Sequence, residues 1–218
     1  MPDTARQDAN ATLVASYQRI RAFSEQLCAP LLTEDMGLQA CADVSPPRWH
    51  LAHTTWFFET FLLKPHLPDY RVFQPQFEYL FNSYYNGIGE QFSRPQRHLL
   101  SRPTGEEVYA WRRQVDQAMA RLIEGQPALA ERLTLGLNHE QQHQELLLTD
   151  LKYSLSFNPL APAIGQPLTA ADKVAPLGFT PFNGGLVEIG ANENGFAFDN
   201  ETPRHRVWLE PFALANRP

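Results

Sequence analysis

Residues 45–63 read SPPRWHLAHTTWFFETFLL, and this stretch predicts a buried helix. Ser45 is the expected N-cap, because its side chain can accept a hydrogen bond from the first turn. Pro46 and Pro47 suit that turn, where a missing N–H leaves no helical hydrogen bond unmade. Apolar side chains then recur on nearly every side of the helix to about Leu63. A helix without a polar face is buried among other elements, so we expect a helical bundle around it.

Three further segments predict long helices. Residues 13–27 carry an apolar stripe at three- and four-residue steps, typical of a helix that packs on one side. Residues 104–125 open with Thr104 and, three positions on, Glu107, which is the spacing of a capping box. The last segment covers residues 127–153.

Four helices joined by connections of unequal length predict a mainly α protein with a four-helix bundle. Residues 65–103 form the long crossover of this bundle, and their many aromatic side chains indicate that they pack on it. The chain has 218 residues, of which 43% are hydrophobic, so it has enough apolar material for a sizeable core.

The placement of proline predicts a domain boundary near residue 158. Only one proline occurs between residues 104 and 158, whereas eight occur from residue 159 onward, and helix interiors reject proline. We therefore expect a bundle at residues 1–158, a linker at 159–181 and the start of a β-containing unit at 182–218. Two short strands are expected in that unit, at residues 182–190 and 207–210.

Charge and cysteine content exclude several classes of protein. The formal net charge is −6, the wrong sign for binding nucleic acid or anionic lipid through a general basic field. Cys28 and Cys41 are too few for a disulfide scaffold and predict reduced thiols. No signal peptide and no apolar run near the ~20 residues of a membrane span occur. We expect a cytoplasmic protein without nucleic-acid or membrane partners; its oligomeric state stays open.

The stretch Asn-His-Glu-Gln-Gln-His at residues 138–143 predicts a metal site on the last helix. His139 and His143 are four positions apart, so their imidazoles share a helix face and can converge on one ion. The helix at residues 45–63 offers His50 and His53 as further ligands, and helical spacing alone does not choose between them. The competing interpretation is that these are core histidines without a ligand.

His139-Glu140-x-x-His143 also matches the zinc-protease pattern, in which the glutamate is a general base. The extended form of that pattern fails, because Leu146 and Thr149 stand where a glycine and a third histidine belong. We therefore do not favour a protease. Glu140 is expected to orient another group or to face solvent.

Two arginines in the crossover, Arg94 and Arg97, flank Pro95 and Gln96. Two guanidiniums at this spacing could bind a carboxylate in an otherwise acidic protein. On spacing alone, a pair of solvated surface arginines is the favoured interpretation.

Taken in order, these motifs resemble the sulfoxide synthases of ergothioneine biosynthesis, the EgtB family. The resemblance is carried by residues 46–59, by Arg94-Pro-Gln-Arg97, by residues 139–143 and by Glu201-Thr-Pro-Arg-His205. It implies a DinB-like bundle followed by a domain similar to formylglycine-generating enzymes, with a C-type-lectin-like α+β fold. It also implies that the metal ligands are His53, His139 and His143, and that His50 is a structural neighbour.

The activity implied by the resemblance uses Fe(II) and dioxygen. A thiol, γ-glutamylcysteine or cysteine, is joined to C2 of the imidazole of hercynine, giving a sulfoxide. Three neutral imidazoles suit ferrous iron because they leave coordination positions open for reactants. By resemblance, Arg94 and Arg97 hold carboxylates of the thiol. Gln142 reaches the bound imidazole or a water in one interpretation and is a polar packing residue in the other.

Residues 182–218 resemble only the opening of the second domain. The tyrosine acid and the hercynine pocket of the family correspond to later parts of that domain, so no catalytic acid is assigned here, and we expect an N-terminal portion with little activity alone. One alternative function is a DinB-type metal-dependent thiol transferase or hydrolase that uses zinc or nickel. Another is a non-catalytic fragment whose strands bind a partner chain.

Overall fold

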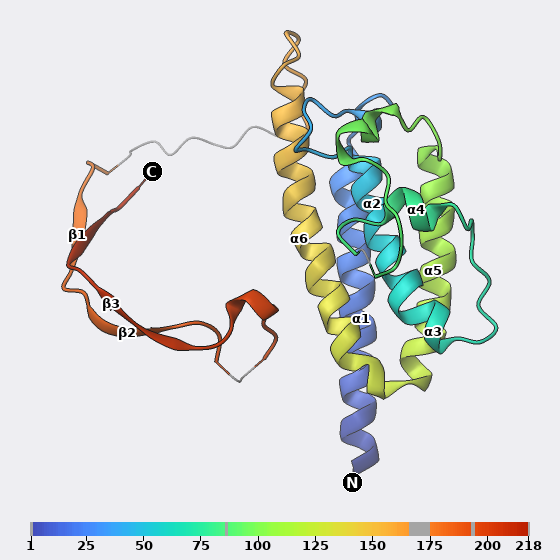
Figure 1. Cartoon of the computed structure of the whole chain (residues 1–218), viewed down its shortest axis with the longest axis horizontal. Helices are drawn as coiled ribbons and strands as arrows, with labels where there is room; N and C mark the ends of the chain where they lie inside the picture. Colours follow the sequence, from blue (N-terminus) through green and yellow to red (C-terminus); the bar gives the residue numbers. More distant parts are fainter. Residues whose placement is uncertain (1, 86, 166–174, 193–194, 218) are drawn as a thin grey trace. The chain divides into compact units, whose positions relative to one another are not determined.

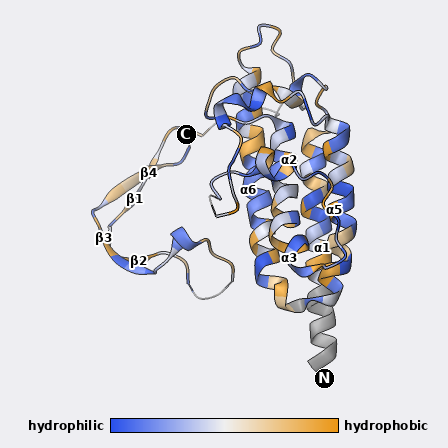
Figure 2. Cartoon of the chain, turned by 45° about the vertical axis from the view of Figure 1, so that its right-hand side comes forward, coloured by the Kyte–Doolittle hydropathy of each residue, from blue (hydrophilic) through white to orange (hydrophobic). Residues whose placement is uncertain are grey.

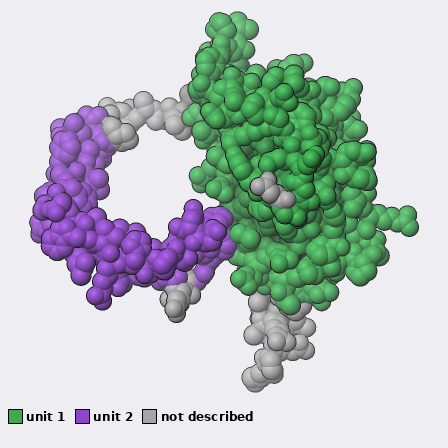
Figure 3. Space-filling model, in the orientation of Figure 1, with its two compact units in different colours: residues 1–165 green, residues 166–218 purple. Residues whose placement is uncertain are grey.

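The computed structural model describes residues 2–85, 87–165, 175–192 and 195–217. The chain divides into two compact units, Met1–Gly165 and Gln166–Pro218 (Figure 3). The first unit is helical and contains the hydrophobic core, and the second contains short strands (Figure 1). Among the described residues, no helix combines the length and the apolar composition needed to cross a membrane.

The first unit is a helical bundle, so the prediction of a mainly α fold is confirmed. Its long elements are α1 (Pro2–Cys28), α2 (Pro47–Phe58), α5 (Gly105–Gly125) and α6 (Ala130–Leu155). Helix α2 packs against α5 and α6, and α1 packs against the same two helices. Helices α1, α5 and α6 carry both hydrophobic and hydrophilic residues along their length, as expected for helices with one side on a core (Figure 2).

Helix α2 is buried along its whole length, as its composition predicts. Every residue of α2 except Arg48 is buried, and the helix continues through a π-helical stretch, η2 (Glu59–Leu63), into the short α3 (Lys64–His66). The prediction of Ser45 as N-cap is wrong, because Pro46 holds that position and no side chain caps the helix. Ser45 makes tertiary hydrogen bonds instead, which are described with the site below.

Helix α5 begins with the predicted capping box. The hydroxyl of Thr104 accepts a hydrogen bond from the backbone N–H of Glu107 at 3.1 Å, and the Glu107 carboxylate accepts one from the backbone N–H of Thr104 at 2.6 Å. Two backbone donors at the helix start are thereby satisfied. The predicted capping box of this helix is confirmed.

The crossover between α3 and α5 packs on the bundle, as its aromatic content predicts. It contains the short helix α4 (Phe77–Phe81) and the 3-10 helix η3 (Arg94–Leu99). Phe77 and Phe81 are buried, and their ring centroids lie 4.9 Å and 5.7 Å from that of Trp111 in α5. Two other short 3-10 helices, η1 (Asp35–Gly37) and η4 (Pro127–Leu129), precede α2 and α6.

The second unit contains two antiparallel strand pairs and the 3-10 helix η5 (Asp199–Glu201). Strand β1 (Phe179–Phe182) pairs with β4 (Phe212–Ala215), and β2 (Gly185–Ile189) pairs with β3 (His205–Leu209). The strand expected at residues 207–210 is thus present as β3. Strand β1 covers the end of the stretch predicted as a linker, and residues 166–174 of that stretch lie outside the described residues.

The strand predicted at residues 182–190 is interrupted, and Gly184 is the reason. Its φ is +70°, and a Cβ atom added to it would lie 2.3 Å from the carbonyl oxygen of Leu209. Only glycine fits such a left-handed position against a neighbouring backbone. The chain therefore bends after Phe182, and a separate strand starts at Gly185.

Candidate metal centre

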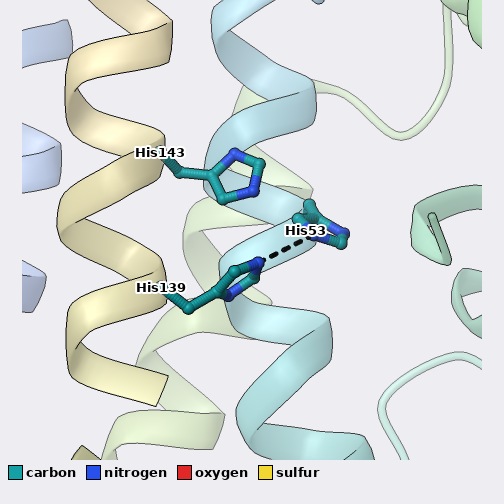
Figure 4. A group of neighbouring side chains, drawn as sticks. All are labelled: His53, His139 and His143. Carbon is teal, nitrogen blue, oxygen red and sulfur yellow. Dashed lines mark hydrogen bonds between the residues drawn. The ribbon is translucent and has the colours of Figure 1, made fainter. Parts of the chain in front are cut away.

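Three histidines meet between α2 and α6 (Figure 4). His53 comes from α2, and His139 and His143 come from consecutive turns of α6. One nitrogen of each ring lies within 4.8 Å of one nitrogen of both others, which is close enough for a single metal ion to contact all three. His53, His139 and His143 are called the three-histidine group below. His50, which the spacing could not separate from His53, does not belong to it.

A glycine lets the two helices approach each other beside this group. Gly136 lies one turn before His139 in α6, and a Cβ added to it would lie 2.7 Å from ring carbons of both Phe57 and Phe58 in α2. Real Cβ contacts are not this short, so the phenyl rings occupy the space that any other residue would need. The close packing of α2 on α6 therefore depends on this position.

Hydrogen bonding leaves one nitrogen of His53 free for a metal. Its Nδ1 lies 2.6 Å from the carbonyl oxygen of Phe81, and because a carbonyl can only accept, Nδ1 carries the proton. The neutral ring then has its lone pair on Nε2, which lies 3.3 Å from Nε2 of His139. A carbonyl that orients the far nitrogen of a ligand is typical of histidines that bind metals.

Two indole rings hold the imidazole of His53 in place. The ring of Trp49 stacks on it with centroids 4.6 Å apart and an angle of 10° between the planes, and Trp56 stacks with values of 5.4 Å and 13°. These residues lie four positions before and three positions after His53 along α2, and the imidazole is only 2% exposed. Its orientation is therefore set before any ligand binds.

The ring of His143 contacts His50. Their Nδ1 atoms lie 2.9 Å apart, and Nε2 of His50 lies 3.1 Å from a carboxylate oxygen of Asp150. Nε2 of His143 takes no part in these contacts and is the nitrogen that can serve the three-histidine group. His139 makes no second contact of this kind, because within the described structure its buried Nδ1 has no hydrogen-bond partner.

Burial keeps all three imidazoles neutral near pH 7. Burial lowers the pKa of His139 to about 4. The pKa values of His53 and His143 are held well below their usual range, first by burial and then by the neighbouring histidines. A neutral imidazole has a lone pair and no charge to repel a cation, so this is the form that binds a metal.

The donor set fits a divalent transition metal. Imidazole nitrogens suit zinc, copper, iron and nickel, and three ligands on one side leave coordination positions open for other molecules. Glu140, the neighbour of His139, points elsewhere: it is fully buried and bonded to Arg21, Arg112 and Ser24. A carboxylate held in this way is not available as the general base of a protease.

The structure brings Arg97 close to the three-histidine group. Its guanidinium lies over the ring of Trp49, 3.4 Å from the centroid, and donates to the hydroxyls of Ser45 at 2.8 Å and Ser83 at 3.2 Å. Trp49 therefore contacts both Arg97 and His53. Burial, assisted by the charge of Arg94, lowers the pKa of Arg97 to about 9. Arg97 is a buried cation, not the solvated surface residue that spacing alone allowed.

Arg94 lies next to Arg97 and keeps part of its donor capacity unused. It donates to the Tyr84 hydroxyl at 2.8 Å and to the backbone oxygen of Asp43. Among the atoms that the structure describes, Nε of Arg94 and Nε of Arg97 are both buried without a hydrogen-bond partner. Unused guanidinium donors in a buried place suit an anionic group such as a carboxylate.

Gln142, the remaining candidate site residue, is exposed on α6 directly before His143. Its side chain is not a buried packing residue.

Sequence reasoning missed several residues that surround the three-histidine group. Asp150 follows His143 by seven positions, two helical turns along the same face, and this spacing could have indicated its role. The stacking of Trp49 and Trp56 on His53 could also have been inferred from their four- and three-residue spacing. The hydrogen bonds of Ser45 with Asp150 and Arg97 could not be predicted from the sequence, because these partners lie in α6 and in the crossover.

The fold and the site define a helical-bundle protein with a three-histidine group between two of its helices. The family model of the DinB superfamily matches residues 16–147, more than half of the chain, and the chain belongs to this superfamily. The matched range includes the three-histidine group, Arg94 and Arg97. A search among curated proteins found no match.

Proposed function

We propose that this protein is an iron(II)- and oxygen-dependent sulfoxide synthase of the EgtB type. It would join γ-glutamylcysteine or cysteine to C2 of the imidazole of hercynine. Two features together carry the proposal. Three neutral imidazole nitrogens lie within 4.8 Å of one another, and beside them lie the buried Arg97 and the half-buried Arg94, each with an unused Nε donor. The first suits a metal, and the second suits the carboxylate of a thiol substrate.

His53, His139 and His143 would hold the iron. When bound there, an iron(II) ion would supply open coordination positions and the one-electron chemistry that dioxygen activation needs. The protein itself keeps the ligand rings neutral by burial and fixes that of His53 between two indoles. These contacts are made before substrates arrive.

Arg94 and Arg97 would bind the carboxylates of the thiol substrate. Arg97 is 3% exposed and lies on the face of Trp49, which itself stacks on the metal ligand His53. A carboxylate held by these guanidiniums would place the rest of a small thiol near the three-histidine group. Gln142 would contact the bound imidazole or a water from the exposed side of α6.

The overall reaction balances without a further reductant. A new C–S bond replaces the S–H bond of the thiol and the C2–H bond of hercynine. One atom of dioxygen ends on sulfur, and the other leaves as water with the two hydrogens. The resemblance places the tyrosine acid in a part of a C-type-lectin-like domain that residues 182–218 do not include, so no residue of this chain is proposed as the acid.

Thiol binding can be tested on this chain without turnover. Cobalt(II)-loaded protein is titrated anaerobically with γ-glutamylcysteine, and a sulfur-to-cobalt charge-transfer band is recorded. We expect the band with γ-glutamylcysteine and none with γ-glutamylserine, which lacks the sulfur. In Arg97→Met the dissociation constant of γ-glutamylcysteine should rise about tenfold, as for a lost bond to a charged group. Binding of cysteamine, which has no carboxylate, should be the same in both proteins.

Oxygen uptake tests the reaction itself. Iron(II)-loaded protein is mixed with hercynine, with thiol, and with both, and products are identified by mass spectrometry. Little activity is expected of residues 1–218 alone, so the proposal expects slow oxygen consumption and traces of sulfoxide, and both only when hercynine and thiol are present together. Sulfoxide formed by zinc-loaded protein, or uptake with neither substrate, would contradict it.

A DinB-type thiol transferase or hydrolase is the second candidate. It is favoured by the extent of the family match, which covers the bundle and not the second unit. Such an enzyme would use zinc or nickel bound by the same three histidines. Transfer or hydrolysis by zinc-loaded protein without oxygen would favour this function over the first.

A further inference from the structure

A chain of hydrogen bonds leads from the three-histidine group to Arg97. It starts at His143, whose Nδ1 lies 2.9 Å from Nδ1 of His50. Nε2 of His50 lies 3.1 Å from Oδ2 of Asp150, and the same oxygen accepts the backbone N–H of Ser45 at 2.8 Å. The hydroxyl of Ser45 accepts from Arg97 at 2.8 Å. This series of hydrogen bonds thus joins α2, α6 and the crossover.

Metal binding by His143 allows only one position for the ring proton of each histidine in this series of hydrogen bonds. If His143 binds a metal through Nε2, its neutral ring carries its proton on Nδ1 and donates to Nδ1 of His50. His50 must then carry its own proton on Nε2. The carboxylate of Asp150 lies 3.1 Å from that nitrogen and can accept its proton, and the backbone N–H of Ser45 holds the same carboxylate.

We propose that His50 and Asp150 are positioning residues that hold the His143 imidazole with its proton on Nδ1 and its Nε2 lone pair free for the metal. This inference rests on the proposed metal site and not on the reaction carried out there. Carboxylate–histidine pairs behind a ligand are a known way to fix the proton and the orientation of a ring, and their loss typically weakens metal binding 10- to 100-fold. Here the pair acts through a second histidine.

The alternative explanation is that His50 is a core histidine whose hydrogen bonds are complete and that has no part in metal binding. It is 3% exposed, and a buried polar side chain with two partners needs no further role. The two explanations differ in what they require of His143. A purely structural pair leaves the proton position of His143 and its metal affinity independent of Asp150, whereas a positioning pair controls both.

The first test is nitrogen NMR of the wild-type chain with ¹⁵N-labelled histidine, metal-free and zinc-loaded. Signals are assigned with single-histidine variants. We expect His143 to be protonated on Nδ1 and His50 on Nε2 in both states. A His143 ring protonated on Nε2 in the metal-free chain overturns the proposal, whether or not the protein makes a sulfoxide.

The second test is metal affinity, measured by competition of zinc(II) and cobalt(II) with a chelating dye. Asp150→Leu and His50→Phe should weaken binding about 10- to 100-fold. Asp150→Asn and His50→Gln keep an acceptor oxygen and should recover most of the affinity. Glu145→Ala, on the exposed side of α6, is the matched control and should bind as the wild type does.

The outcomes separate the two proposals. Unchanged affinity in both Asp150→Leu and His50→Phe, with each variant folded, overturns the positioning role. Weakened affinity with the predicted proton positions supports that role even if the cobalt(II)-loaded protein shows no thiol charge-transfer band, in which case only the sulfoxide synthase assignment is lost.

Discussion

Two polar clusters lie within the bundle, and adjacent residues of α6 belong to them. Glu140 belongs to the ion-pair cluster, defined as Arg21, Arg112 and Glu140. Its neighbour His139 belongs to the three-histidine group. The ion-pair cluster is fully buried, whereas His139 and His143 are half-buried. The two clusters also differ in charge and in how completely their polar atoms are paired.

The ion-pair cluster is closed. One carboxylate oxygen of Glu140 accepts from Ser24 at 2.6 Å and from Arg112 at 3.1 Å, and the other accepts from Arg21 at 3.0 Å. The three-histidine group is open: two Nε2 atoms face each other at 3.3 Å, and one Nδ1 has no partner among the described residues. Complete pairing of the charged groups stabilises the fold, whereas nitrogen lone pairs that converge on one point favour binding of a cation.

Removing the carboxylate of the ion-pair cluster should have the largest effect. In Glu140→Ala, Arg21 and Arg112 lose the buried carboxylate between them and keep the more exposed Asp116 and Glu25 as counter-charges. The free energy of unfolding should therefore fall by about 3 kcal/mol, the lower end of the range for a broken buried ion pair. Urea denaturation of metal-free protein measures it. Glu145→Ala removes an exposed carboxylate five positions later and should change stability by less than about 0.5 kcal/mol. Equal effects of the two variants would show that the cluster does not stabilise the bundle.

Removing a ligand should affect binding instead of folding. His53→Ala leaves two imidazoles, so the affinity for cobalt(II) should fall by more than the ~100-fold that loss of an orienting partner costs. Thermal unfolding of the metal-free variant should stay cooperative. His98→Ala, at an exposed histidine, is the control for both measurements. Retained affinity in His53→Ala would place the metal elsewhere.

A substitution at Gly136 should disturb both clusters, because this residue precedes His139 and Glu140 by one turn. In Gly136→Ala the added methyl meets Phe57 and Phe58, and overpacking of this kind costs about 1–3 kcal/mol. Metal affinity should fall as well, since the helices that carry the ligands must separate. Gly125→Ala is the control, because an added Cβ there has open space. A change in stability without a change in affinity would show that the clusters respond independently.

The smallest expected effect is on how the stability of the fold changes at acidic pH, through the carboxyl group of Glu140. Burial acts to raise the pKa of Glu140, but Arg21, Arg112 and the hydrogen bonds outweigh it and hold this pKa below its ordinary value. Its contribution to stability is therefore present above the unfolded-state pKa of about 4.3 and is lost as the pH falls through the lower, folded-state pKa. Metal-free Glu140→Gln should lose less stability on acidification than the wild type. An identical pH profile for the two proteins would contradict this assignment.

Local patterns predicted the helices and the ligand pair. The capping box at Thr104, the apolar stripe at residues 13–27 and the four-residue spacing of His139 and His143 all depend on neighbours within one helix, so they can be read without a fold. Ser45 shows the limit of such reasoning. Its position before two prolines favours an N-cap, but hydrogen bonds to Asp150 and from Arg97, both distant in sequence, use it instead.

The roles of Glu140, His50 and Arg97 could not be predicted from spacing, because each depends on a partner from another element. Glu140 follows a ligand in a pattern typical of proteases, yet Arg21 in α1 and Arg112 in α5 bind it. His50 and His53 lie three residues apart on one buried helix. Only the packing of α6 places one beside His139 and the other beside Asp150.

The sequence by itself determined that this chain forms a helical bundle with two histidines on one face of a helix, because hydrophobic periodicity and side-chain direction are properties of a single helix. Spacing did not choose the third histidine, which only the family resemblance indicated. The tertiary structure decided that His53 joins the pair, that Glu140 is an ion-pair partner and that Arg97 is buried beside the group. Those choices depend on which nitrogen and oxygen atoms of different helices come within hydrogen-bonding distance, and helix packing sets that distance.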